Sequence, residues 1–231
     1  MFNIYIADLN ICIENKYPLI EQMCQGYITK SKEYDFKVSV TDAEIRREDD
    51  GKGFHVSYLE ILAVYRKIAE KIIEYKGFLM HGVVIETERQ GIMFAAKSGT
   101  GKTTHALLWQ KLLGDKMVFV NGDKPLIRII GDEVYAYGTP WAGKENLHAN
   151  MRTHLKTICF IERSDTNECI KLDRESIFKR LYVHLYKPEN KPKLMEMFDM
   201  LDTFINKIDF YLIKCNKDLS AAENSYNTIF K

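Results

Sequence analysis

The chain has 231 residues, and its 33 Lys and Arg almost balance its 32 Asp and Glu, which gives a formal net charge of +1. This balance excludes a polybasic protein that binds mainly a nucleic acid backbone. Hydrophobic residues make up 46% and aromatic residues 12% of the chain, which is typical of a packed globule. No apolar run approaches the roughly 20 residues of a membrane-spanning helix. We therefore expect neither a nucleic acid nor a membrane as a partner.

The cysteines and the first residues indicate the compartment. The five cysteines are scattered, odd in number and never spaced as C-x-x-C. This pattern predicts reduced thiols and argues against a disulfide framework or a zinc site. The first 13 residues include Asp8 and lack the basic region that begins a signal peptide. We expect a cytoplasmic protein.

Residues 1–53 predict a small N-terminal α/β module. Phe2–Glu14 is rich in β-branched residues around a turn at Asp8, which indicates two short strands. A helical turn or two is expected in Pro18–Gly26, a strand in Asp35–Val40, and a short helix in Asp42–Glu48, which Thr41 and Glu44 introduce as a capping box. The polar loop Asp49–Gly53 then marks the expected boundary with a second domain, residues 54–231.

The second domain begins with an amphipathic helix. Apolar residues recur at spacings of three and four over Ser57–Lys76, as in a helix that packs on a core. The apolar segments Phe78–Glu86 and Gly91–Ala96 follow, joined by a four-residue turn. These two strands must be antiparallel neighbours, because a parallel crossover needs a dozen or more residues.

The rest of the domain alternates between further hairpins and helices. We expect a hairpin of Leu126–Ile130 with Val134–Tyr137, and another of His154–Glu162 with Glu168–Leu172. The remaining predicted elements are helices at Lys102–Leu113, Glu175–Tyr186, Leu194–Lys207 and Leu219–Phe230, and strands at Met117–Val120 and Phe210–Lys214. The order predicts an α/β (α+β-like) fold with a mixed, largely antiparallel sheet.

Ala96–Thr103 reads A-K-S-G-T-G-K-T, a Walker A sequence in which Ala96 replaces the first glycine. Its glycines allow a concave ring of backbone N–H donors, Lys102 can reach the β- and γ-phosphates, and the Thr103 hydroxyl can ligate Mg²⁺. A strand before it and a helix after it supply the context that the motif requires. It predicts that ATP or GTP, with Mg²⁺, is bound by Ser98, Gly99, Thr100, Gly101, Lys102, Thr103 and Thr104.

Four segments in this order carry a family resemblance: H-G-V-V-I, F-A-A-K-S-G-T-G-K-T-T, V-N-G-D-K-P-L-I-R and Y-G-T-P-W-A-G-K-E-N. Together they resemble the C-terminal domain of HPr kinase/phosphorylase and its relative, ATP-dependent phosphoenolpyruvate carboxykinase. The resemblance covers about Phe78–Arg163. It implies a P-loop fold of that type and phosphoryl transfer from Mg-ATP to a hydroxyl acceptor, either a serine of a protein or peptide or a small metabolite.

The resemblance also implies catalytic residues. The family's acidic pair matches Gly122 and Asp123, so Asp123 is left as metal ligand or base, unless it only forms a turn. His81 matches a histidine near the transferred phosphate, although a single histidine in an apolar strand is commonly structural. Lys144 lies in a segment suited to a lid or acceptor loop, where it would neutralise phosphate charge. The alternative is a surface loop anchored by Trp141.

Two other readings remain open. Gly122 favours a regulatory or accessory protein that binds nucleotide without phosphoryl transfer. An ordinary P-loop ATPase would instead have a parallel sheet, which an antiparallel pair of Phe78–Glu86 with Gly91–Ala96 excludes. The sequence leaves open the acceptor, the choice between ATP and GTP, and the oligomeric state.

Overall fold

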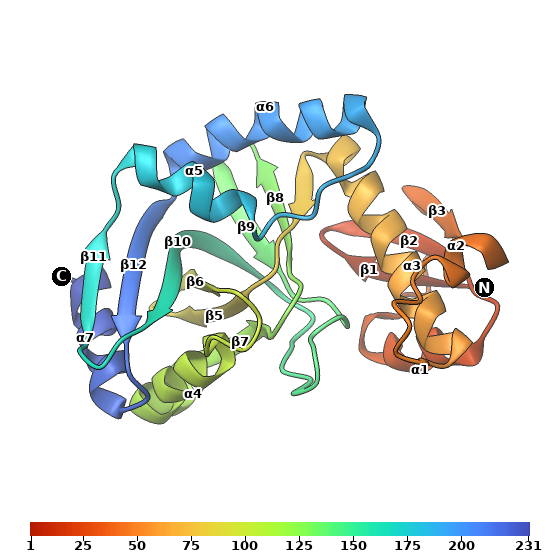
Figure 1. Cartoon of the computed structure of the whole chain (residues 1–231). Helices are drawn as coiled ribbons and strands as arrows, with labels where there is room; N and C mark the ends of the chain where they lie inside the picture. The colour runs from red at the N-terminus through yellow and green to blue at the C-terminus, as the bar shows by residue number, and fades with distance from the viewer.

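The structure, a computed structural model, describes residues 1–231 as two β-sheets with helices around them (Figure 1). The small sheet has the strand order β1–β2–β3, in which β2 is antiparallel to β1 and parallel to β3. The first elements are β1 (Phe2–Ile6), β2 (Leu9–Glu14), α1 (Pro18–Met23), a 3₁₀ turn (Gln25–Tyr27), β3 (Phe36–Ser39) and α2 (Asp42–Arg46). The predicted capping box is confirmed, because the Thr41 hydroxyl accepts the Glu44 N–H at 3.3 Å and the Glu44 carboxylate accepts the Thr41 N–H at 2.8 Å.

The long helix α3 (Val56–Lys71) lies against the small sheet (Figure 1). Its residues Leu59, Ala63 and Val64 share a hydrophobic core with residues of β1 to β3. Glu60 is fully buried and accepts the backbone N–H of Tyr17 at 3.0 Å. The helix therefore packs across the expected boundary after residue 53, and that boundary stays a prediction. A 3₁₀ turn, Ile72–Tyr75, continues the helix.

The large sheet has nine strands in the order β4–β8–β9–β10–β6–β5–β7, with β12 on β10 and β11 on β12. Strand β10 is parallel to β6 and β12, and all other neighbours are antiparallel. The strands are β4 (Gly77–Leu79), β5 (Val83–Thr87), β6 (Gln90–Ala95), β7 (Met117–Asn121), β8 (Leu126–Ile130), β9 (Glu133–Tyr137), β10 (Arg152–Arg163), β11 (Glu168–Lys171) and β12 (Asp209–Cys215). The mixed sheet is confirmed, and the antiparallel β5–β6 pair excludes the parallel sheet of an ordinary P-loop ATPase.

Two strand predictions are wrong. Phe78–Glu86 is not one strand, because the chain breaks at Met80–Gly82: β4 pairs with β8, whereas β5 pairs with β6 and β7. The hairpin of His154–Glu162 with Glu168–Leu172 does not form either. Both edges of that part of β10 are occupied by β6 and β12, so β11 pairs with β12 instead.

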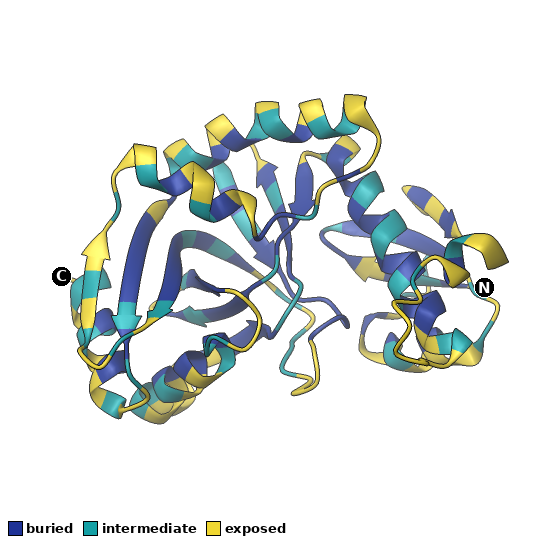
Figure 2. Cartoon of the chain, viewed as in Figure 1, coloured by how far each residue is buried: buried dark blue, intermediate teal, exposed yellow.

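Helices cover both faces of the large sheet (Figure 1). On one face lie α5 (Arg174–Tyr182) and α6 (Lys191–Lys207), and on the other lie α4 (Lys102–Leu113) and α7 (Leu219–Ile229), with a 3₁₀ turn (Gly114–Lys116) after α4. The strands between them are largely buried, and the outer faces of the helices are exposed (Figure 2). None of these helices combines the length and hydropathy that crossing a membrane requires.

Candidate functional site

The strand order brings three chain segments to one edge of the large sheet. Strand β5 lies between β6 and β7 and is antiparallel to both, so β6 and β7 run in the same direction. The end of β6, the end of β7 and the start of β5 therefore meet at one edge. They place Ala96–Gly101, Asn121–Lys124 and His81 at one pocket, although His81 and Lys124 are 43 positions apart in the chain.

The Walker A-like segment forms a loop between β6 and α4. Gly99 and Gly101 have φ angles of 76° and 129°, values that side-chain-bearing residues rarely adopt. Arg163, at the end of β10, holds this loop: its Nε donates to the carbonyl of Thr100 at 3.1 Å, and its Nη2 donates to the carbonyl of Gly99. Arg163 thus satisfies two carbonyl groups of the loop. The first amide groups of α4, in contrast, have no hydrogen-bond acceptor within the helix.

Lys102 turns back onto this loop. Its side chain is buried, and Nζ donates a hydrogen bond to the carbonyl of Ala96 at 3.0 Å. Burial lowers the pKa of Lys102, and the nearby Asp123 carboxylate opposes that effect. A desolvated ammonium with one carbonyl partner is suited to exchanging that partner for an anionic ligand.

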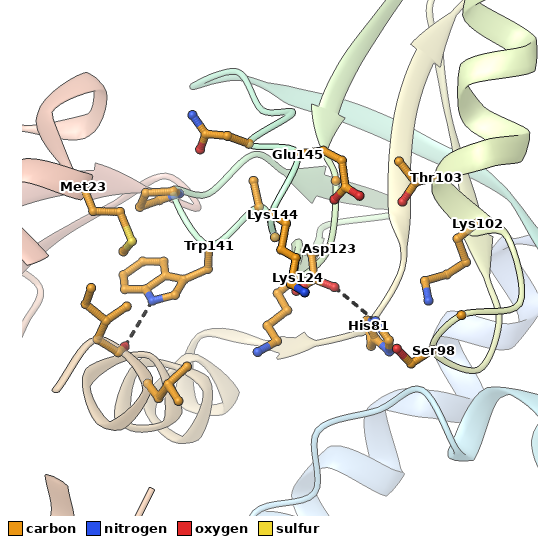
Figure 3. A pocket seen from close by; sticks show the side chains of 18 of the residues that line it. Met23, His81, Ser98, Lys102, Thr103, Asp123, Lys124, Trp141, Lys144 and Glu145 are labelled. Carbon is orange, nitrogen blue, oxygen red and sulfur yellow. Dashed lines mark hydrogen bonds and ion pairs between the residues drawn. The ribbon is translucent and has the colours of Figure 1, made fainter. Parts of the chain in front are cut away.

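His81 and Asp123 form the central pair of the site (Figure 3). The His81 Nε2 lies 3.1 Å from Asp123 Oδ1. Two backbone hydrogen bonds hold the pair in place: the Gly82 N–H donates to the Asp123 carbonyl at 2.9 Å, and the His81 N–H donates to the His184 carbonyl at 2.8 Å. The histidine lies in the break between β4 and β5, where its ring reaches the end of β7.

The fully buried Asn121 shapes the turn that carries Asp123. Its side-chain oxygen accepts the N–H groups of Asp123 at 2.9 Å and of Lys124 at 2.7 Å. Its amide nitrogen donates to the Thr139 carbonyl at 3.1 Å, which ties the turn to the next loop. These contacts also explain Asn at this position, since it is satisfied on both sides.

The charges around Asp123 favour its ionised form. Burial alone would raise its pKa, but the His81 hydrogen bond and the charges of Lys124, His81 and Lys102 outweigh burial and lower it. The site thus contains an anionic carboxylate among cationic side chains.

His184, whose carbonyl accepts the His81 N–H, is a neutral neighbour of the site. Burial and the neighbouring charges of His81, Lys102 and Lys187 lower the pKa of His184 to about 4, so this histidine is neutral at pH 7.

Two glycines let the segment Thr139–Leu147 pack on this turn. A Cβ atom on Gly122 would lie 2.9 Å from the Ala142 carbonyl oxygen and 3.1 Å from that of Leu147. A Cβ atom on Gly143 would lie 3.1 Å from the Asp123 Cβ. Gly122 therefore serves close packing of the loop, a role that the comparison with an acidic pair did not suggest.

A pocket of about 770 Å³ joins these groups. Lys144 lines it as an exposed side chain, and Lys124, Glu145 and Asn146 contribute further polar groups. All predicted site residues line this pocket except Thr100, which lines a neighbouring cavity of about 30 Å³ with Arg163: the pocket residues are Ser98, Gly99, Gly101, Lys102, Thr103, Thr104, His81, Asp123 and Lys144.

One wall of the pocket is apolar and comes from α3 and α1. It consists of Tyr58, Ile61 and Leu62 on α3, Met23 on α1, and Trp141. The Trp141 Nε1–H donates to the carbonyl of Ile61 at 3.1 Å, so the loop is fixed to the helix. Sequence analysis missed this wall because its helix looked like core alone. No signal in the sequence separated Tyr58 from the core residues of this helix, because its exposure depends on the tertiary packing.

The donor set suits Mg²⁺ held together with a phosphate. No group of three or more His, Cys, Asp or Glu side chains in the structure is arranged to hold a metal ion. Magnesium commonly takes one or two protein ligands and fills its octahedron with phosphate oxygens and water. The Thr103 hydroxyl and the Asp123 carboxylate, which line one pocket, match that requirement.

Of the comparisons with known proteins, only the one with solved structures gives matches. No protein-family model and no curated protein matches it. Among solved structures, the Hpr(Ser) kinase/phosphatase from Coxiella burnetii aligns with 66% of this chain and 99% of its own, at a TM-score of 0.37 and 10% sequence identity. At this level the similarity does not assign a function.

Proposed function

We propose that this chain binds Mg-ATP and transfers its γ-phosphoryl group to a hydroxyl acceptor. The observation that carries the proposal is the His81–Asp123 pair in the same pocket as Lys102 and Thr103. Phosphoryl transfer requires a phosphate clamp, a metal ligand and a carboxylate near the nucleophile. This pocket has a candidate for each. ATP and GTP are both candidates, because these groups address only the phosphates.

Each residue has a role in the proposed reaction. The loop amides and Lys102 would bind the β- and γ-phosphates, Thr103 would hold Mg²⁺, and Asp123 would serve either as a second ligand of Mg²⁺ or as the base. When bound, Mg²⁺ supplies positive charge that neutralises the phosphate oxygens. Lys144 would neutralise charge on the transferred group.

The transfer itself exchanges one P–O bond for another. The acceptor oxygen forms a bond to the γ-phosphorus, and the bond from that phosphorus to the bridging oxygen breaks, so the nucleoside diphosphate leaves with the electron pair. With Asp123 as the base, the hydroxyl proton passes to its carboxylate, which the His81 Nε2 orients at 3.1 Å.

Nucleotide binding by the wild type and by Lys102→Ala tests the first step. We expect the variant to bind ATP at least tenfold more weakly, because it loses a cation from the phosphate site. Lys111→Ala is the matched control, since Lys111 lies exposed on the same helix. Equal ATP binding by wild type and Lys102→Ala would contradict the proposal.

A regulatory protein that binds nucleotide without transfer is the second candidate, favoured by the single carboxylate left beside Gly122. Introducing an aspartate at this position is a poor test, because its Cβ would lie 2.9 Å from the Ala142 carbonyl oxygen. Incubation with γ-labelled ATP and a set of hydroxyl acceptors separates the two. Transfer that depends on Asp123 supports the kinase, and tight ATP binding without transfer to any acceptor supports the regulator.

A further inference from the structure

We infer that the end of the pocket beside α3 is an acceptor subsite, and that it binds a small hydroxy acid with an apolar substituent. The inference rests on the proposed function and adds the class of acceptor. Below, "acceptor end" means the part of the pocket lined by Met23, Tyr58, Ile61, Leu62 and Trp141.

The acceptor end presents exposed apolar surface mainly through Tyr58, with half-buried Leu62 and Met23 beside it. Tyr58, Ile61 and Leu62 are spaced at i, i+3 and i+4, so they share one face of α3. Ile61 and Trp141 are only 5% and 6% exposed and belong to the core that the helix shares with the small sheet, whereas Tyr58 is 40% exposed and Leu62 is half-buried. Binding an apolar group here would remove this surface from water.

The acceptor end also lies on the side of Asp123 from which an acceptor hydroxyl would attack in an in-line transfer. Figure 3 shows Lys102 and Thr103 on one side of Asp123, and Met23 and Trp141 on the other. The attacking and leaving oxygens of phosphoryl transfer lie roughly in line with the phosphorus. With the diphosphate at Lys102, the acceptor hydroxyl must approach from the Trp141 side.

Unpaired positive charge at this end selects an anionic group. Lys124 lines the pocket, half-buried, and its ammonium makes no ion pair or hydrogen bond in the structure; it extends from the Asp123 turn toward α3 (Figure 3). Lys144 likewise has no ion-pair partner. Glu145, the other carboxylate of the pocket, points toward Thr103 and away from Trp141 (Figure 3). A carboxylate on the acceptor would therefore meet Lys124.

The size of the pocket favours a small molecule. Its volume of about 770 Å³ lies within the range of small-molecule and cofactor sites, and it has to hold the nucleotide as well. The acceptor then needs three features: a hydroxyl for Asp123, an apolar group for α3 and a carboxylate for Lys124.

Three probes that all carry the hydroxyl separate the apolar group from the carboxylate: 3-phenyllactate has both, lactate lacks the phenyl group, and 2-phenylethanol lacks the carboxylate. Each is titrated calorimetrically into the full chain with Mg²⁺ and a non-hydrolysable ATP analogue. We expect 3-phenyllactate to bind about tenfold or more tightly than either of the others, because it alone satisfies both contacts. Equal affinities, or no binding of 3-phenyllactate to the nucleotide complex, would overturn the inference.

Variants assign each preference to its residue. Tyr58→Ser should reduce the preference for 3-phenyllactate over lactate, and Lys124→Gln should reduce its preference over 2-phenylethanol, each by about fivefold. Tyr34→Ser, at another exposed tyrosine, is the control and keeps both preferences. If both variants also keep them, the subsite is wrong. If the wild type binds no ATP analogue, the proposed function fails instead, which calorimetry without a probe shows separately.

Discussion

The indole ring of Trp141 lies parallel to the phenol ring of Tyr65, with ring centroids 4.1 Å apart and planes 4° apart. The Tyr65 hydroxyl in turn donates to the carbonyl of Lys124, in the turn that carries Asp123. One aromatic stack therefore links α3, the Thr139–Leu147 segment and the carboxylate of the site. The helix that packs on the small sheet thus also fixes the geometry of the large sheet's edge.

Shortening Trp141 tests this link. Trp141→Ala should lower the free energy of unfolding by about 3–5 kcal/mol, because a buried indole is replaced by a cavity. Trp141→Phe keeps an aromatic ring but loses the hydrogen bond to Ile61, which costs about 1 kcal/mol. Urea unfolding measures both. Equal losses in the two variants would show that the stack contributes nothing.

Asp123→Asn should abolish most of the proposed transfer. The amide cannot take the hydroxyl proton, so the rate with a γ-labelled ATP assay should fall about 100-fold or more. ATP should still bind through Lys102 and the loop. Asp199→Asn, at an exposed position of α6, is the matched control and should keep the wild-type rate. Unchanged transfer by Asp123→Asn would remove this carboxylate from the mechanism.

Arg163→Ala should weaken nucleotide binding indirectly, through the loop, because Arg163 does not line the pocket that would hold the phosphates. The guanidinium holds the carbonyls of Gly99 and Thr100, so its loss frees the loop to adopt other conformations. We expect about a tenfold loss of ATP affinity in calorimetry, since ordering the loop then costs entropy on binding. Arg174→Ala, which removes only an exposed ion pair with Asp202, should leave the affinity unchanged. Similar losses in both variants would contradict the role of Arg163.

Gly122→Ala should disturb the site through packing alone. The added methyl group would lie 2.9 Å from the Ala142 carbonyl oxygen, so the loop must shift or the fold loses about 1–3 kcal/mol of stability. Gly26→Ala is the control, because a Cβ there meets no atom within 4 Å. Thermal unfolding of the two variants gives the comparison, and equal melting temperatures would show that the loop yields freely.

The stability of the fold should fall in mild acid because of two buried histidines. Burial lowers the pKa of His105 to about 4, and burial with neighbouring charges lowers that of His184 to about 4. The unfolded chain binds a proton at each near pH 6.5, so the free energy of unfolding should drop between pH 6.5 and pH 4, by about 1.4 kcal/mol per pH unit for each histidine.

Urea midpoints at pH 7 and pH 5 measure this dependence. His105→Gln should show a shallower pH dependence than the wild type, because one of the two proton sites is gone. His55→Gln, at an exposed position, should keep the wild-type slope. A slope that His105→Gln does not change would assign the acid sensitivity to other groups.

From the sequence alone, most local elements and part of the pocket lining could be predicted. The capping box at Thr41, the glycine-rich loop before Lys102 and the two strands around the tight turn at Glu88 were all readable, because each depends on residues close in the chain. The mixed sheet followed from the shortness of that turn. The joint position of His81, Lys102 and Asp123 in one pocket agrees with the order of the motifs.

The residues that pack against each element could be identified only from the three-dimensional arrangement. Periodicity showed that α3 has an apolar face, but not that Tyr58 would be left uncovered beside Trp141. The pairing of β11 with β12 and the packing of Gly122 against Ala142 could not be read either. Propensities and sequence motifs reflect interactions among a few neighbouring residues. Strand partners and pocket walls depend on contacts between segments that are distant in the chain, and the free energies of alternative contacts must be compared over the whole chain.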